Sequence, residues 1–328
     1  MTRFKKNFAA NADMLFCFLL LGLIFAICLN PLPYINATYK GFCVWAQIVL
    51  PSLFMFFILT KILMQMDSSF KVFGALDKPF DKLCGVKKYG GYVFLMSVLS
   101  GYPIGAKLTS ELYENGLVTS DEASRMLSFT STSGPMFVVG SVASKMFGNV
   151  KLGIVVFVCH ILSALINGIF YRNVKNPTQS KRQQTNNISP SKQTLNDIVL
   201  NSIISLLMVG GYIALCFCLL ESVLHSGIGA AINNGITRAF GVNLVAPIVA
   251  GMLEVTNGCV ALGQLALSAR TLCIILTCLT TFGGLSIHLQ SQMFASKCGT
   301  RYSYFLKIKT TQTLIAFVLS LVASFIFF

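Results

Sequence analysis

Long apolar runs separated by short polar segments follow one another along this chain. The runs that approach or exceed the length of a membrane helix are Met14–Leu29, Phe42–Met66, Lys151–Phe170, Ile198–Leu220, Thr271–Ala295 and Thr310–Phe328. A bilayer core about 30 Å thick is crossed by roughly 20 helical residues. The pattern predicts an all-α polytopic membrane protein with about seven transmembrane helices and two re-entrant hairpins.

The hairpins are predicted from apolar stretches that are too short to cross a bilayer. Residues 92–99 rise only about 12 Å as a helix, and Leu244–Met252 is similarly short. Broken helices are tolerated at membrane depth where their backbone lines a cavity or is buried in protein. The breaks are expected at Ser100–Gly105, Thr130–Pro135, Glu254–Gly258 and Gly283–Gly284.

The order of these elements repeats in the two halves of the chain. We expect an N-terminal membrane helix in residues 1–41, a first repeat in 42–171, a polar basic cytoplasmic linker in 172–197 and a second repeat in 198–328. The first helix of the first half is predicted to run toward the cytoplasm and the first helix of the second half away from it. The two halves are therefore expected to be inverted-topology repeats, as in many transporters. Chance matching of hydropathy is the alternative.

Composition excludes a soluble enzyme. Hydrophobic residues make up 55% of the 328 residues and charged residues 11%, whereas an ordinary soluble domain carries about 25% charged residues. A formal net charge of +14 would suggest nucleic acid in a soluble protein. Here the basic residues lie mainly in the segments between the apolar runs, and most of these segments are predicted to be cytoplasmic. Lys309, which precedes the last apolar run, is counted among the cytoplasmic residues. We therefore expect no nucleic-acid partner, but a multi-pass protein of the bacterial inner (cell) membrane with a cytoplasmic N-terminus. The lipid bilayer is its first partner, and a homo-oligomer is left open.

Motifs for catalysis or metal binding do not occur in the sequence. The 11 cysteines form no C-x-x-C pair or cluster with His, and H-E-x-x-H, G-x-S-x-G and phosphate-binding glycine loops are absent. We expect neither an enzyme nor a cofactor, apart from a coupling proton or sodium ion. His160 in mid-span is expected to form a hydrogen-bonded interhelical contact, and a proton relay is the alternative.

Glu254 is the only carboxylate inside an apolar arm. A charge at bilayer depth costs about 2.5 to 3.5 kcal/mol, so Glu254 is the first site candidate. Its possible roles are proton or cation coupling, a hydrogen bond to substrate, or a structural pair with a lysine at the first break. Thr256 and Asn257 follow it, and Gln290 lies beyond the glycine pair.

The first break offers groups suited to an anion. Helices that start after Gly105 and Gly134 direct positive dipole ends at whatever lies between them. Lys107 stands beside this break, although its amine could instead extend to lipid headgroups, and the serines could instead bond the local backbone. The predicted substrate-binding residues are Tyr102, Pro103, Gly105, Lys107, Ser131, Thr132, Ser133, Gly134, Glu254, Thr256, Asn257 and Gln290.

The glycine motifs carry a resemblance to a known family. The chain resembles the sporulation integral membrane protein YlbJ family in four segments and one residue beyond them: Ser100–Lys107, Gly134–Phe137, Gly251–Gly258, Phe282–Ser286 and Gln290. The resemblance covers nearly the whole chain from Pro51. It implies a polytopic inner-membrane protein with a nucleoside-recognition (Gate) domain, related to nucleoside transporters. For members in endospore formers, it also implies movement of dipicolinic acid across a forespore membrane. Ser131–Thr132 stand where the family pattern has an Asn-Asn pair.

We expect a transporter or permease for a small polar solute, an anionic aromatic such as dipicolinate, working by alternating access between two opposed hairpins. A dicarboxylate suits the helix dipoles and Lys107. A nucleoside would use Asn257, Gln290 and the hydroxyls instead, and a non-transporting membrane scaffold associated with sporulation is the competing class.

Overall fold

The computed structural model describes residues 2–66, 68, 72–175, 194–225 and 244–328. All regular secondary structure among them is helical, so the all-α class is confirmed. Most of the expected linker and the stretch 226–243 lie outside the described residues.

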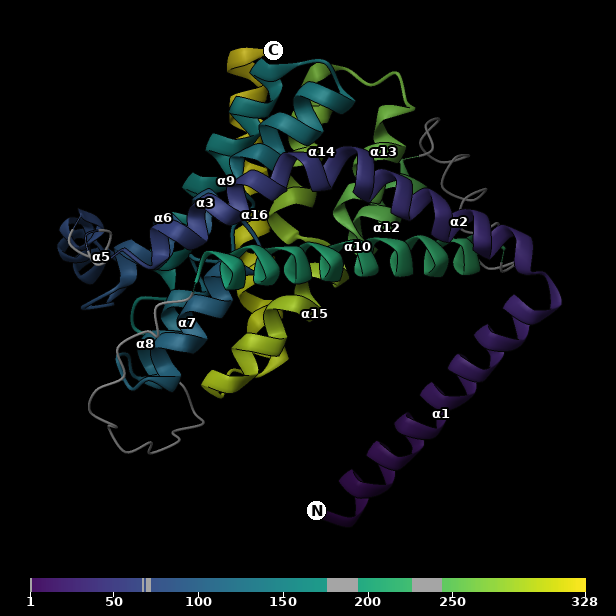
Figure 1. The fold of residues 1–328 in the computed structure, drawn as a ribbon, viewed down its shortest axis with the longest axis horizontal. Helices are drawn as coiled ribbons and strands as arrows, with labels where there is room; N and C mark the ends of the chain where they lie inside the picture. Colours follow the sequence, from purple (N-terminus) through teal and green to yellow (C-terminus); the bar gives the residue numbers. More distant parts are fainter. Residues whose placement is uncertain (1, 67, 69–71, 176–193, 226–243) are drawn as a thin grey trace.

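The N-terminal part forms a bent arm. Helix α1 (Thr2–Leu29) leaves the rest of the protein as a separate rod in Figure 1, and the chain bends by 102° before α2 (Pro31–Val44). Helix α2 continues through one π-helical turn, η1 (Trp45–Val49), into α3 (Leu50–Met64). The π-turn directly precedes Pro51, whose missing N–H breaks the α-helical hydrogen-bond ladder.

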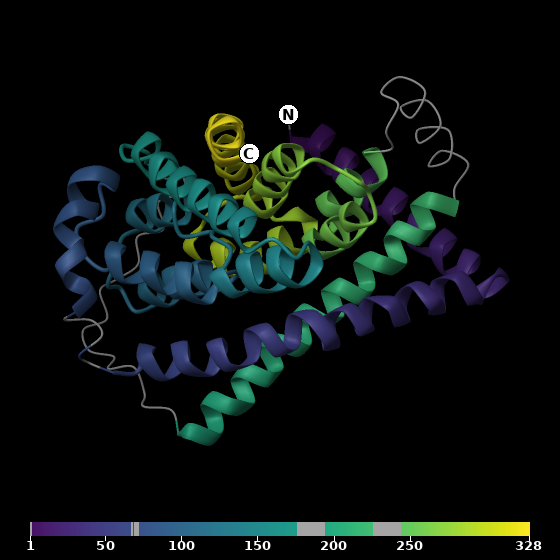
Figure 2. The same cartoon turned by 90° about the horizontal axis from the view of Figure 1, so that it is seen from above.

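Helix α10 (Leu195–His225) packs against this long helix to form what we call the two-helix layer, residues 31–64 and 195–225. A Cβ on Gly41 would lie 2.7 Å from the Cα of Ala214, and the indole of Trp45 donates to the carbonyl of Leu206 at 3.0 Å. Figure 2 shows the two helices crossing on one side of the remaining helices, which we call the body.

The first half of the body contains the expected breaks. Short elements η2 (Gly74–Leu76) and α5 (Asp77–Cys84) precede α6 (Gly90–Ser100) and α7 (Ile104–Glu114), then α8 (Ser120–Leu127), the π-helix η3 (Met136–Met146) and α9 (Val150–Phe170). A Cβ on Gly105 would lie 2.9 Å from the Cβ of Ser97, so α6 and α7 form a tight hairpin. The capping box expected at Thr119–Glu122 starts α8.

The described part of the second half also contains a hairpin of short helices, a helix break and a long final helix. Its helices are α12 (Val245–Leu253), α13 (Val255–Gly263), α14 (Ala269–Phe282), α15 (Gly284–Ala295), η4 (Ser296–Cys298) and α16 (Tyr302–Phe327). Helices α12 and α13 form the second hairpin, in which a Cβ on Gly258 would lie 2.5 Å from the Cα of Gly251. The inverted orientation of the two halves stays a prediction.

Within the described residues, four helices are long and apolar enough to cross a bilayer, or up to five if the bent pair counts as one span. They are Val150–Phe170, Leu195–Ser222, Ala269–Cys298 and Tyr302–Phe327. Other apolar helices, such as Gly90–Ser100 and Met136–Met146, are shorter because the chain breaks beside them. Large apolar side chains are exposed on the outer surface, among them Phe25, Ile204, Val318 and Phe325. This surface suits lipid, and the polytopic membrane class is confirmed.

Candidate functional site

The two breaks of each half touch one another. A Cβ on Gly101, which has φ of 77°, would lie 2.7 Å from the amide nitrogen of Gly134. In the second half, a Cβ on Gly284, with φ of 68°, would lie 2.8 Å from the carbonyl oxygen of Gly251. Only glycine accommodates both the left-handed backbone and these approaches. The sequence motifs therefore mark points where broken helices cross.

A small cavity of about 60 Å³ lies where the breaks meet the two-helix layer. This volume holds no more than a few water molecules. The layer contributes the apolar side chains Val49, Leu53, Val209 and Ile213. The body contributes the polar lining residues Ser100, Tyr102, Ser133, Glu254, Thr256, Ser286 and Gln290.

Glu254 is 4% exposed and forms the N-cap of α13. One carboxylate oxygen accepts from the Thr256 hydroxyl and the other from the backbone N–H of Asn257, both at 2.9 Å. The structural lysine pair considered from the sequence is not formed, because the carboxylate makes no ion pair within the described part of the chain. Glu254 thus combines a local capping role with a place in the cavity wall.

The helix ends at the cavity have both polarities. Each break joins the C-terminal end of one helix to the N-terminal start of the next, as at α6 and α7 or at α12 and α13. N-terminal ends favour anions and C-terminal ends favour cations. The helix ends alone therefore do not determine whether the site favours an anion or a cation. That preference depends on the charged side chains nearby.

Lys309 is a charged residue of this region that the sequence interpretation placed wrongly. It is fully buried on α16, and its amine donates to the Tyr102 hydroxyl at 2.8 Å, the Ser131 carbonyl at 3.1 Å and the Gln312 side-chain carbonyl at 3.1 Å. It was counted as cytoplasmic because the last helix was expected to start at Thr310, whereas α16 begins at Tyr302. The buried face of α16 includes Phe305, Ile308, Lys309, Gln312 and Ala316, a helical spacing that could have revealed it.

One known protein is clearly similar to this chain. The sporulation integral membrane protein YlbJ of Bacillus subtilis (strain 168) is 29% identical over 315 residues, which cover 88% of this chain and 77% of the relative. This similarity agrees with the resemblance to the YlbJ family that the glycine motifs indicate. No family model matches the chain and no solved structure matches it. The nucleoside-recognition (Gate) assignment therefore stays a prediction, while the integral membrane class agrees with the relative's name.

His160 connects the two halves of the chain. Its Nε2 accepts from the backbone N–H of Ser133 at 2.8 Å, and its Nδ1 lies 2.8 Å from the Thr281 hydroxyl. The Ser133 bond requires Nε2 to be unprotonated, which leaves Nδ1–H to donate. The interhelical contact expected for His160 is present.

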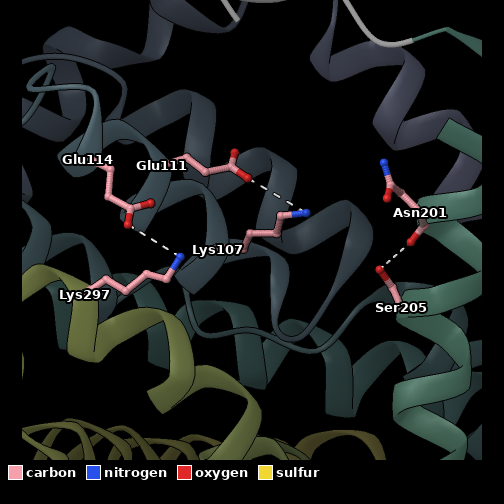
Figure 3. Close-up of polar contacts among 6 residues, drawn as sticks. All are labelled: Lys107, Glu111, Glu114, Asn201, Ser205 and Lys297. Carbon is pink, nitrogen blue, oxygen red and sulfur yellow. Dashed lines mark hydrogen bonds and ion pairs between the residues drawn. The ribbon is translucent and has the colours of Figure 1, made fainter. Parts of the chain in front are cut away.

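The predicted place of Lys107 in the site needs a correction, because this residue does not line the cavity. Its side chain is 37% exposed and its amine lies 3.9 Å from Glu111 on the next turn of α7. Figure 3 shows Lys107, Glu111 and Glu114 along α7, with Glu114 paired to Lys297 at 3.5 Å. The spacing of these three residues places them on one partly exposed face of α7, and none of the three lines the cavity.

The other predicted residues divide into three groups. Tyr102, Ser133, Gly134, Glu254, Thr256 and Gln290 line the cavity. Four further residues belong to the breaks and do not line the cavity: Pro103, Gly105, Ser131 and Thr132. The Tyr102–Pro103 peptide is cis, and Gly105 packs on Thr130. The Ser131 carbonyl accepts from Lys309, and the Thr132 hydroxyl donates to the Ser97 hydroxyl. Asn257 is buried, and its side-chain amide has no partner among the described residues.

Proposed function

We propose that this protein is a membrane transporter for a small anionic solute, working by alternating access around the cavity between the broken helices. The observation that carries the proposal is the meeting of two pairs of broken helices around a small cavity whose lining includes several polar residues and the buried carboxyl group of Glu254. Interrupting helices inside a membrane leaves backbone groups without their usual partners, a cost that discontinuous helices of transporters offset by binding solutes and ions.

The size of the cavity indicates how transport would proceed. Ligand pockets usually measure about 300 to 1,000 Å³, several times the 60 Å³ found here. We therefore propose that the structure represents a state in which the cavity is too small to hold the solute, so that transport requires the cavity to widen. Opening would separate the polar residues of the breaks from the apolar side chains of the two-helix layer. Because the layer lines the cavity with apolar side chains, this separation would break no hydrogen bond to the layer's lining side chains.

Glu254 is our candidate for coupling. A buried carboxylate without a cationic partner is costly, so binding a proton or a sodium ion would relieve the charge. Thr256 could share that ion, since its hydroxyl already contacts the carboxylate. We further propose inverted repeats in residues 42–171 and 198–328, with the N-terminus in the cytoplasm of a bacterial cell.

The test is uptake into proteoliposomes. Labelled dipicolinate and labelled uridine are offered separately to the wild type, to Glu254→Ala and to Glu111→Gln, the matched control that alters a carboxylate outside the cavity. We expect dipicolinate uptake by the wild type and the control, and uptake at least tenfold lower in Glu254→Ala. Uridine uptake alone would favour the nucleoside class. No uptake of either solute, under imposed proton or sodium gradients, would favour the scaffold.

A further inference from the structure

The amine of Lys309 is buried beside the cavity without an acidic partner in the described part of the chain. Its three hydrogen bonds all go to uncharged oxygens. Neutral acceptors offset only part of the cost of burying an ammonium group. An incoming anion would complete this compensation.

Two unused donors lie next to this amine. The Ser131 hydroxyl and the Gln312 side-chain nitrogen are both buried, since Ser131 is 3% exposed and Gln312 is 1% exposed. Neither atom has a hydrogen-bond partner among the described residues. Both residues already contact Lys309 through another atom, since the amine bonds the Ser131 carbonyl and the Gln312 Oε1. The lysine contact fixes the orientation of the Gln312 amide, so its N–H groups are the unsatisfied side.

Tyr102 separates this group from the cavity. Its side chain lines the cavity, its hydroxyl accepts from Lys309, and the Lys309 amine lies 4.9 Å from the centre of its ring. A phenol is a weaker acceptor for an ammonium group than a carboxylate is. A carboxylate that entered past Tyr102 could therefore replace its hydroxyl.

We propose that Lys309, Ser131 and Gln312 form a carboxylate-binding subsite behind Tyr102. The ammonium, the hydroxyl and the amide N–H donate to one carboxylate of the solute, while the rest of the solute occupies the enlarged cavity. This inference rests on the proposed transport function for its physiological meaning, and it makes Lys309, in place of Lys107, the residue that selects anions.

Binding to the purified protein in detergent tests the subsite independently of transport. The probes are dipicolinate, benzoate and pyridine-2,6-dicarboxamide, a neutral analogue of dipicolinate with a similar shape. The variants are Lys309→Met, Gln312→Glu and Ser131→Ala. Ser110→Ala is the matched control, because Ser110 on α7 also has a buried hydroxyl that finds no partner among the residues the structure describes. Gel filtration and thermal unfolding establish that each variant is folded.

We expect the wild type to bind the carboxylates at least tenfold more tightly than the diamide. Lys309→Met removes this preference, and Gln312→Glu lowers dipicolinate affinity more than tenfold by supplying a resident carboxylate to Lys309. Ser131→Ala lowers it about threefold or more, the loss of one hydrogen bond, whereas Ser110→Ala has no effect. Should Lys309→Met fail to fold, the other two variants carry the test.

Three results would overturn the subsite: no carboxylate binding by the wild type, equal affinity for dipicolinate and the diamide, or unchanged dipicolinate affinity in folded Gln312→Glu and Ser131→Ala. Uptake measured in parallel separates this inference from the proposed function. Carboxylate binding that depends on Lys309 without any uptake would support the subsite and contradict the transporter.

Discussion

The amine of Lys309 donates to the hydroxyl of Tyr102 at 2.8 Å across 207 residues of sequence. The same tyrosine hydroxyl lies 3.3 and 3.2 Å from the carbonyls of Thr280 and Thr281. Tyr102 therefore connects the first break, the end of α14 and the last helix. Because this contact ties together the elements around the cavity, its loss should affect stability as well as binding.

Tyr102→Phe should destabilise the protein by about 2 kcal/mol, since a buried ammonium loses one acceptor. The measurement is reversible unfolding in detergent or bicelles, with Tyr39→Phe as the control because Tyr39 is 68% exposed on α2. Equal stability of the two variants would show that the Lys309 contact contributes nothing to folding.

Gly105→Ala should prevent correct assembly of the first hairpin. Its Cβ would lie 1.8 Å from the Thr130 carbonyl oxygen, a clash with backbone that we expect to cost more than about 3 kcal/mol. Gly211→Ala on α10 is the matched control, because no atom from the other described parts of the chain lies within 4 Å of its Cβ position. Monodisperse yield and melting temperature compare the two, and a well-folded Gly105→Ala protein would contradict the close crossing.

Glu254→Gln should separate capping from coupling. A glutamine carbonyl can still accept from the Asn257 N–H, so the fold is expected to persist within about 1 kcal/mol. Gradient-driven accumulation of solute should fall at least tenfold because the amide takes up no proton, while solute exchange at equal concentrations should change less than about twofold. Accumulation equal to that of the wild type would exclude Glu254 as the coupling group.

Lys107→Ala should leave uptake within about twofold of the wild type. The residue belongs to a partly exposed ion pair with Glu111, and such pairs contribute about 0 to 1 kcal/mol. Initial rates of dipicolinate uptake provide the measurement. A loss as large as that expected for Lys309→Met would return Lys107 to the site.

Local sequence features predicted much of the architecture. Gly101, Gly134 and the Gly283–Gly284 pair lie at helix breaks, the Thr119–Glu122 box caps α8, and Glu254 lines the cavity. Each of these follows from a preference of a few neighbouring residues, either for an unusual backbone or for a cap. Such preferences can be recognised without knowing what the segment packs against.

The contacts that assemble the site could not be predicted in this way. Lys309 was assigned from its distance to an apolar run, but its position depends on the true start of α16 and on acceptors in the first half of the chain. Lys107 was assigned from its closeness to a glycine motif, although its side chain is partly exposed beside Glu111 and does not line the cavity. The bond between His160 and Thr281 likewise joins residues 121 positions apart.

Alternating access is tested most directly by the accessibility of the cavity from each side of the membrane. Ser133→Cys places a thiol in the cavity wall, and peptide mapping by mass spectrometry distinguishes its labelling from that of the native cysteines. We predict that a membrane-impermeant thiol reagent modifies residue 133 from either side of oriented vesicles, and that dipicolinate slows both reactions. Modification from one side only, or from neither side with or without dipicolinate, would contradict the proposed mechanism.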